Sequence, residues 1–131
     1  MLIGELAKQV GCEAETIRYY EREGLLQEPS RTASGYRSYT GEHLGQLNFV
    51  LRCRALGMSL SEIRTMQRYQ AHPDLACAEI NDMIDYHIAH VQKQIREMLL
   101  LEKQLRDLRR RCHDNSTVST CGILQGIVDA G

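Results

Sequence analysis

The sequence predicts a mainly α-helical chain: a winged helix-turn-helix domain, then one long helix, then a short C-terminal loop and helix. Two amphipathic helical patterns meet at Gly11, within "IGELAKQVGCEAETIRYYEREGLL". A stretch punctuated by proline, serine and glycine follows them and predicts a small hairpin. Neither glycine nor proline occurs from Ala78 to Arg111, which predicts a helix of about 34 residues, roughly 50 Å long.

Composition sets limits on what the chain does. Its 131 residues, 43% of them hydrophobic, suffice for one small domain and an extended element. No apolar stretch approaches the roughly 20 residues that span a bilayer, so we expect a cytoplasmic protein without a membrane partner. The net charge of −1 argues against coating nucleic acid by bulk electrostatics, but allows a local basic face. In a reducing cytosol, five cysteines are thiols or metal ligands rather than a disulfide framework.

The helix-turn-helix is predicted at about 3–23. Apolar residues recur at helical spacing on both sides of Gly11, and Gly24 closes the second pattern. The helical pattern by itself supports two interpretations of the polar face of the second helix equally well. It is either a solvated surface or the face of a recognition helix that lies across a major groove. That face is formed by Thr16, Arg18, Tyr19 and Arg22.

The segment at about 29–40 predicts a β-hairpin, or wing. Pro29 and Gly35 punctuate it, and Tyr36, Arg37 and Tyr39 favour extended chain beside a cation. Two further helices follow, the first ending at a glycine cap and the second opening with a serine and a glutamate at capping-box spacing. Together these elements predict a DNA-binding domain over 1–72, bounded by a proline.

The predicted long helix carries an apolar residue every seventh position: Ile84, Val91, Met98, Leu105 and Cys112. So small a chain cannot bury this stripe internally. The stripe therefore needs a partner, most simply the same helix of a second copy in a parallel or antiparallel coiled coil. We assign 73–111 to a linker and dimerisation helix, and 112–131 to a loop and a short C-terminal helix.

The helix-turn-helix segment, the wing "GYRSYT" and the join "LRCRALGMSLSEI" together resemble the MerR family of bacterial transcription regulators. The resemblance covers nearly the whole chain, with the motifs in the family's order and spacing. Within the family, the chain is most similar to the metal-responsive branch, and there to the cadmium- and lead-responsive CadR and PbrR regulators. The resemblance implies a regulator and not an enzyme.

This resemblance implies a homodimer on a near-palindromic operator, between promoter elements spaced more widely than RNA polymerase prefers. The apo dimer would repress, and the metal-bound dimer would activate heavy-metal resistance or efflux genes by distorting the DNA. The implied partners are double-stranded promoter DNA, a second subunit and RNA polymerase at the same promoter. Arg18 and Tyr19 would reach phosphates or base edges, and the wing would grip the flanking backbone through Arg31, Tyr36, Arg37 and Tyr39.

The cysteines divide into two groups. Cys12, in the turn between helices, and Cys53, on an apolar helix face, are interpreted as small buried hydrophobes. Cys77, Cys112 and Cys121 stand at the ends of the long helix or just beyond. In an antiparallel dimer, Cys77 of one subunit would lie beside Cys112 of the other, and the loop to Cys121 would fold over both. Three thiolates would then form a shared site for a soft metal ion.

The resemblance also bears on which kind of metal ion would bind. The family's copper(I) and silver sensors carry serine where this chain has Cys77, and a third thiolate is better balanced by a divalent ion. Zinc-responsive relatives open the loop with a Cys-Cys pair, whereas here Cys112 is followed by His113, a possible auxiliary ligand. We therefore expect lead(II) or cadmium(II), with the C-terminal metal-binding loop as the sensor. Mercury(II) stays a serious competitor, because its sensors have a similar cysteine arrangement, and zinc(II) stays possible.

Two other classes of function compete with metal sensing. Cys112 and Cys121 could close a disulfide in a thiol redox sensor. A metal-buffering protein or zinc enzyme is a weaker alternative, since no carboxylate or histidine arrangement suits activation of a bound water.

Overall fold

The computed structural model describes residues 1–115 and 117–130, so Ser116 and Gly131 of the predicted 112–131 segment lie outside the described residues. The chain forms two units, Met1–Ala76 and Cys77–Gly131. Helices dominate both, and one two-stranded sheet lies in the first. The predicted mainly helical class is confirmed.

The helix-turn-helix consists of α1 (Ile3–Val10) and α2 (Ala14–Arg22). Gly11 ends α1 with φ of +76°, a left-handed conformation that favours glycine, and its N–H donates to the carbonyl oxygen of Ala7 at 2.9 Å. Leu6 of α1 and Ile17 of α2 are completely buried. The helical spacing in the sequence therefore correctly identified both the turn and the inward faces.

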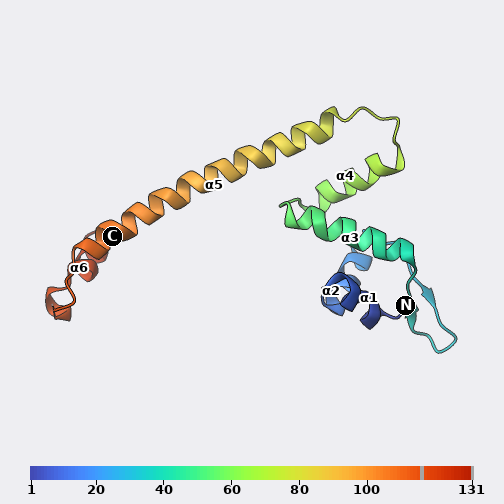
Figure 1. Cartoon of the computed structure of the whole chain (residues 1–131), viewed down its shortest axis with the longest axis horizontal. Coiled ribbons are helices and arrows are strands. Elements are labelled where there is room, and N and C mark those ends of the chain that lie inside the picture. Colours follow the sequence, from blue (N-terminus) through green and yellow to red (C-terminus); the bar gives the residue numbers. More distant parts are fainter. Residues whose placement is uncertain (116, 131) are drawn as a thin grey trace. The chain divides into compact units, whose positions relative to one another are not determined.

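The wing is an antiparallel hairpin of β1 (Ser30–Arg31) and β2 (Arg37–Ser38), visible beside α1 in Figure 1. Ser30 pairs with Ser38, and Arg31 pairs with Arg37. The tip turns at Gly35, whose φ is +85°. This register brings two arginines opposite one another on a short ribbon.

Helices α3 (Gly41–Ala55) and α4 (Leu60–Ala71) complete the first unit. The predicted capping box opens α4: the Ser59 hydroxyl accepts from the Glu62 N–H at 3.1 Å, and the Glu62 carboxylate accepts from the Ser59 N–H at 3.0 Å. Leu47 and Val50 of α3 and Ile63 of α4 are completely buried. The core thus lies among α1–α4, and it leaves the polar face of α2 and the wing outside.

The second unit contains α5 (Ala78–Arg110), a short 3₁₀ turn (Val118–Thr120) and α6 (Gly122–Ala130). The 33 residues of α5 match the predicted long helix, and none of them is buried. Its apolar stripe is open, with Ile88, Val91 and Ile95 each about half exposed. Within the described residues, no helix is long and apolar enough to cross a membrane.

Candidate nucleic-acid interface and metal centre

The outer face of α2 carries two arginines and an exposed tyrosine. Arg18 and Arg22 both pair with Glu15, at 3.2 Å and 3.4 Å, and Arg22 also lies over the ring of Tyr19, 5.9 Å from its centroid. These pairs are exposed and therefore weak, so phosphates can compete for both guanidinium groups. Thr16 lies half-buried on the same helix. Each predicted contact residue of α2 is thus at least partly accessible.

A hollow of about 560 Å³ lies between the start of α1, α2 and the wing. Arg18, Arg31, Tyr36 and Arg37 all line it. Arg31 donates to the carbonyl oxygen of Gly35 at 2.9 Å, across the turn of the hairpin, and Tyr36 is 66% exposed at the tip. Helix and wing therefore present one basic concave surface, although the net charge of the chain is close to zero.

Tyr39 differs from the other predicted contact residues, because its side chain lies in the core at 2% exposure. Its hydroxyl donates to the carboxylate of Glu21, and burial, followed by this bond, raises the pKa of Tyr39. Glu21 also pairs with the Arg37 Nε at 3.1 Å and is itself largely shielded. A shielded carboxylate needs donors, and Tyr39 supplies one. Tyr39 is predicted to grip the DNA backbone with Arg31, Tyr36 and Arg37; its side chain is buried in this structure, and its contact with DNA stays a prediction.

Cys112 and Cys121 lie together at the end of α5. Both cysteines are half-buried, and the Cys112 thiol donates to the carbonyl oxygen of His113 at 3.6 Å. They line a pocket of about 290 Å³ with Arg109 and His113. The neighbouring Cys121 thiol, followed by desolvation, raises the pKa of Cys112, whereas the N–H of Leu124, followed by the Cys112 thiol, lowers the pKa of Cys121. Paired sulfur donors suit a soft, thiophilic cation.

Local contacts hold the loop between these cysteines. The Arg109 guanidinium donates to the carbonyl oxygen of Cys112 at 2.9 Å and to the carboxylate of Asp114 at 3.1 Å. The carbonyl oxygen of Cys121 accepts from the N–H of Gln125, in the first turn of α6, at 3.2 Å. The thiol pair is thus held from α5 on one side and from α6 on the other.

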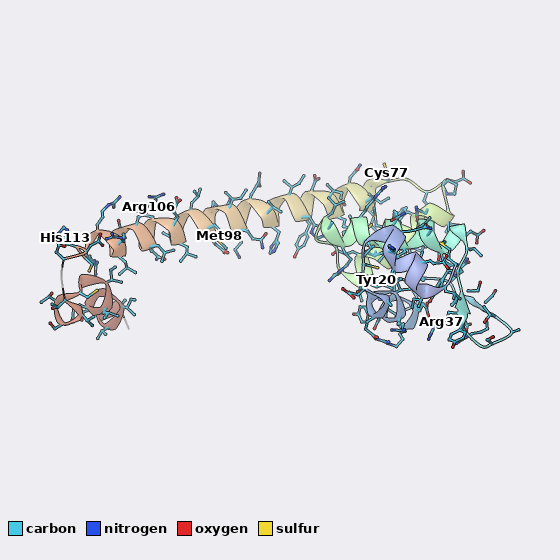
Figure 2. The ribbon with its side chains drawn as sticks, turned by 60° about the horizontal axis from the view of Figure 1, so that its bottom comes forward. Tyr20, Arg37, Cys77, Met98, Arg106 and His113 are labelled. Atoms are coloured by element: carbon cyan, nitrogen blue, oxygen red, sulfur yellow. The ribbon has the colours of Figure 1, made fainter. Side chains whose placement is uncertain are left out.

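Cys77 lies far from this pair along the second unit. It immediately precedes α5, is exposed, and accepts a long contact from the Asn81 side chain at 3.9 Å. Figure 2 shows Cys77 and His113 at opposite ends of α5. Among the described residues, no three His, Cys, Asp or Glu side chains gather to hold a metal. One chain therefore unites two of the three predicted ligands.

The remaining cysteines have the environments expected of structural residues. Cys53 is buried in α3, and burial raises the pKa of its thiol. Cys12 is half-buried, and burial followed by the charge of Glu13 raises its pKa. Both positions disfavour the thiolate form that binds metals.

A winged helix-turn-helix with a basic hollow, joined to a long helix that ends in a thiol pair, defines a DNA-binding regulator with a separate thiol site. The family models agree: MerR HTH family regulatory protein matches residues 1–70, and MerR, DNA binding, matches 44–108. The chain belongs to the MerR family of transcription regulators, and it is not an enzyme.

Its relatives include metal-responsive regulators along nearly the full length. The transcription regulator PbrR691 of Ralstonia metallidurans CH34, solved with lead(II), is 45% identical, with a TM-score of 0.84 over 97% of this chain and 98% of that one. MerR of Bacillus megaterium MB1, solved with mercury(II), is 32% identical, with a TM-score of 0.69 over 98% and 99%. The HTH-type transcriptional regulator ZntR homolog of Haemophilus influenzae is 43% identical over 88% of this chain and 85% of its own.

A further family member has been solved on DNA. HiNmlR, 26% identical with a TM-score of 0.56 over 84% of this chain and 80% of its own, is described as a MerR family regulator lacking the sensor domain, bound to promoter DNA. Promoter DNA is thus an observed partner within the family.

Sequence reasoning missed two sets of residues that shape these sites. Glu21 ties α2 to the wing, and its position in the sequence gives no signal of that role. Gly122 and Gly126 approach the end of α5 closely, and their spacing of four within an apolar segment is the signal that marks a helix face able to pack closely.

Proposed function

We propose that the chain is a homodimeric, metal-responsive transcription regulator of the cytoplasm. In this proposal lead(II) or cadmium(II) is bound by Cys112 and Cys121 of one subunit and by Cys77 of the partner subunit. The apo dimer represses, and the metal-bound dimer activates heavy-metal resistance genes by distorting the promoter DNA. RNA polymerase at the same promoter is the second macromolecular partner.

The thiol pair is the observation that carries the proposal. Cys112 and Cys121 are nine positions apart in the sequence, yet both line one small accessible pocket beyond the end of α5. A bound divalent ion would neutralise the thiolates and join the loop to α5. Two sulfurs alone leave lead(II) or cadmium(II) short of ligands, which favours a third from elsewhere.

The open stripe of α5 supports a second copy as the source of that ligand. Six apolar side chains at alternating spacings of four and three, or of seven, stand exposed along it: Ile84, Ile88, Val91, Ile95, Met98 and Leu105. Cys77 stands one residue before α5, and Cys112 stands two residues after its end. Full antiparallel overlap of two such helices therefore brings each Cys77 level with the partner's Cys112.

The DNA-binding part of the proposal uses the basic hollow of the first unit. Arg18, Tyr19 and Arg22 of α2, with Thr16 beside them, would meet the major groove and its phosphates. Arg31, Tyr36 and Arg37 would hold the flanking backbone from the wing. The Tyr39 hydroxyl would hold the carboxylate of Glu21, which pairs with Arg37 of the wing, so that Tyr39 would orient Arg37 toward the DNA.

The choice of lead(II) or cadmium(II) rests on the donor set. Three thiolates favour a soft divalent ion over hard cations. Relatives solved with lead(II) and with mercury(II) have the same fold as this chain. His113 lines the pocket and is the available auxiliary ligand for zinc(II). Mercury(II) and zinc(II) are thus the competitors to include in any titration.

The test is an anaerobic titration of the reduced apo dimer with lead(II) and with cadmium(II), followed by thiolate-to-metal charge-transfer absorption. We expect saturation in the wild type and a large loss of absorption in Cys77→Ser, because that variant removes the ligand supplied across the dimer. Cys53→Ser is the matched control, since its thiol is buried in the other unit. Equal absorption in Cys77→Ser and wild type would refute the shared site.

The same thiol pair favours a second candidate, a redox sensor. A Cys112–Cys121 disulfide would form with loss of two protons and two electrons to an oxidant such as a peroxide. Reduced protein that changes neither its absorption nor its DNA binding with any of the four metals, but changes DNA binding after peroxide treatment, would establish this candidate instead.

A further inference from the structure

Helix α6 folds back onto the end of α5 through two glycines. Gly122 is the first residue of α6, and Gly126 lies one turn later on the same face. Opposite them are Arg111, which caps α5, and Leu108 of its last turn. We call this contact the α5–α6 junction.

Any side chain at Gly122 would collide with the backbone of α5. A Cβ there would lie 2.2 Å from the carbonyl oxygen of Arg111 and 2.7 Å from its Cβ. Neither atom can move away unless the end of α5 or the start of α6 moves with it. Gly122 is therefore the residue whose missing side chain allows this approach.

Gly126 makes a softer contact. A Cβ there would lie 2.5 Å from the Nη1 of Arg111 and 3.0 Å from a methyl carbon of Leu108. Both atoms are at the far ends of flexible side chains, which can turn aside. Substitutions at the two glycines should consequently differ in their effects, with Gly122 the more severe.

The junction stands directly beside the thiol pair. Cys112 follows Arg111 in the sequence, and Cys121 precedes Gly122. The carbonyl oxygen of Cys121 accepts from the N–H of Gln125 in α6 at 3.2 Å. Any displacement of α6 from Arg111 therefore displaces Cys121 from Cys112.

We infer that Gly122 and, more weakly, Gly126 are positioning residues, whose close contact with Arg111 holds the thiol of Cys121 against that of Cys112. The inference rests on the proposed function for its consequence, metal affinity, but the geometry that it claims can be tested on metal-free protein. Neither glycine is a ligand. They act by allowing α6 to pack closely against the end of α5.

Helix propensity predicts the opposite effect, which makes the inference easy to test. Alanine favours a helix more than glycine does, so propensity alone predicts that Gly122→Ala and Gly126→Ala stabilise α6. Gly45 in α3 supplies the matched control, because a Cβ there meets nothing within 4 Å among the described residues. Gly45→Ala gains the same propensity without any collision.

The first experiment measures lead(II) affinity of the full-length reduced protein against a competing chelator. It compares wild type with Gly122→Ala, Gly126→Ala, Gly45→Ala and Cys121→Ser. We expect affinity at least about tenfold weaker in Gly122→Ala, the size expected for forcing a methyl group into a packed contact. The loss should be smaller in Gly126→Ala, and affinity should be unchanged in Gly45→Ala. Wild-type affinity in Gly122→Ala, together with a loss in Cys121→Ser, would overturn the positioning role alone.

The second experiment needs no metal. Diamide closes the Cys112–Cys121 disulfide in metal-free protein, and the rate of closure reports how often the two sulfurs meet. We expect Gly122→Ala to close about tenfold more slowly than wild type, by the same packing argument. Equal rates would overturn the inference. Undiminished lead(II) binding in Cys121→Ser would instead refute the proposed ligand set, and slow closure in Gly122→Ala would still support the positioning role.

Circular dichroism and sedimentation accompany both experiments. The first unit lies outside the junction, so Gly122→Ala should keep the wild-type helical content and dimer mass. If Gly122→Ala fails to fold, Gly126→Ala decides the question, because its collision involves only flexible side chains. Gly126→Ala should then show a smaller change of the same sign, and no change would overturn the inference.

Discussion

The two cysteines of the thiol pair have the same side chain, but their surroundings shift the two pKa values in opposite directions. The N–H groups at the start of α6, first that of Leu124, and the Cys112 thiol lower the pKa of Cys121. The neighbouring Cys121 thiol, followed by desolvation, raises the pKa of Cys112. The thiolate, rather than the thiol, is the nucleophile and the metal ligand. As pH rises, the thiolate of Cys121 therefore appears before that of Cys112.

We predict that Cys121 is alkylated before Cys112. Reduced, metal-free protein would be treated with limiting iodoacetamide at about pH 8, near the ordinary thiol pKa, and its peptides quantified by mass spectrometry. Cys53 serves as the internal reference, because it is buried and its pKa is raised, so it should react slowest. Faster modification of Cys112 than of Cys121 would contradict the assignment of the lower pKa to Cys121.

At the scale of elements, Glu21 connects the recognition helix to the wing. Its carboxylate receives the Tyr39 hydroxyl and the Arg37 Nε, and only 12% of its side chain is exposed. Glu15, on the same helix, pairs with Arg18 and Arg22 at the solvent-exposed surface. One glutamate therefore fixes the angle between α2 and the wing, whereas the other competes with DNA for two arginines.

The two glutamates should respond to substitution in opposite directions. We predict that Glu21→Gln weakens DNA binding by roughly ten- to a hundredfold, the size of one charge-assisted hydrogen bond of about 1.5–3 kcal/mol. Glu15→Gln should bind as tightly as wild type or more tightly, because it removes a negative charge that holds two cations. Fluorescence anisotropy on a duplex selected in vitro for binding by the wild-type protein measures both. Weaker binding in Glu15→Gln, or unchanged binding in Glu21→Gln, would contradict the scheme.

At the scale of the whole molecule, the second unit is incomplete as one chain. Its stripe is open, and its third candidate ligand stands at the far end of α5 from the other two. In the proposed homodimer, a second copy lying antiparallel along α5 would cover the stripe and supply the third ligand. Dimer formation and completion of the proposed metal site are then a single event.

This coupling predicts complementation between two defective subunits. Cys77→Ser lacks the ligand given to the partner, and the Cys112→Ser, Cys121→Ser double variant lacks the pair. We expect each homodimer to bind lead(II) weakly, and a purified heterodimer of the two to regain one intact site. Charge-transfer absorption and metal stoichiometry measure the recovery. A heterodimer that binds no better than either homodimer would exclude a site shared between subunits.

The local elements could be predicted from the sequence with accuracy. The length of α5 follows from a run without glycine or proline, and the start of α4 follows from Ser59 and Glu62, three residues apart. The inward faces of α1 and α2 follow from helical spacing. Each of these features depends on residues within a few positions of one another, and local hydrogen bonding and hydrophobic periodicity act over that range.

Contacts between residues distant in the sequence were decided only by the tertiary structure. The burial of Tyr39 depends on Glu21 reaching it from another element, and the pairing of Cys112 with Cys121 depends on α6 turning back through Gly122. Helical spacing along α5 likewise identified an apolar stripe but not what covers it. The physical reason is common to all three: a sequence pattern fixes which face of an element is apolar or reactive, whereas the way the chain folds back fixes what that face meets.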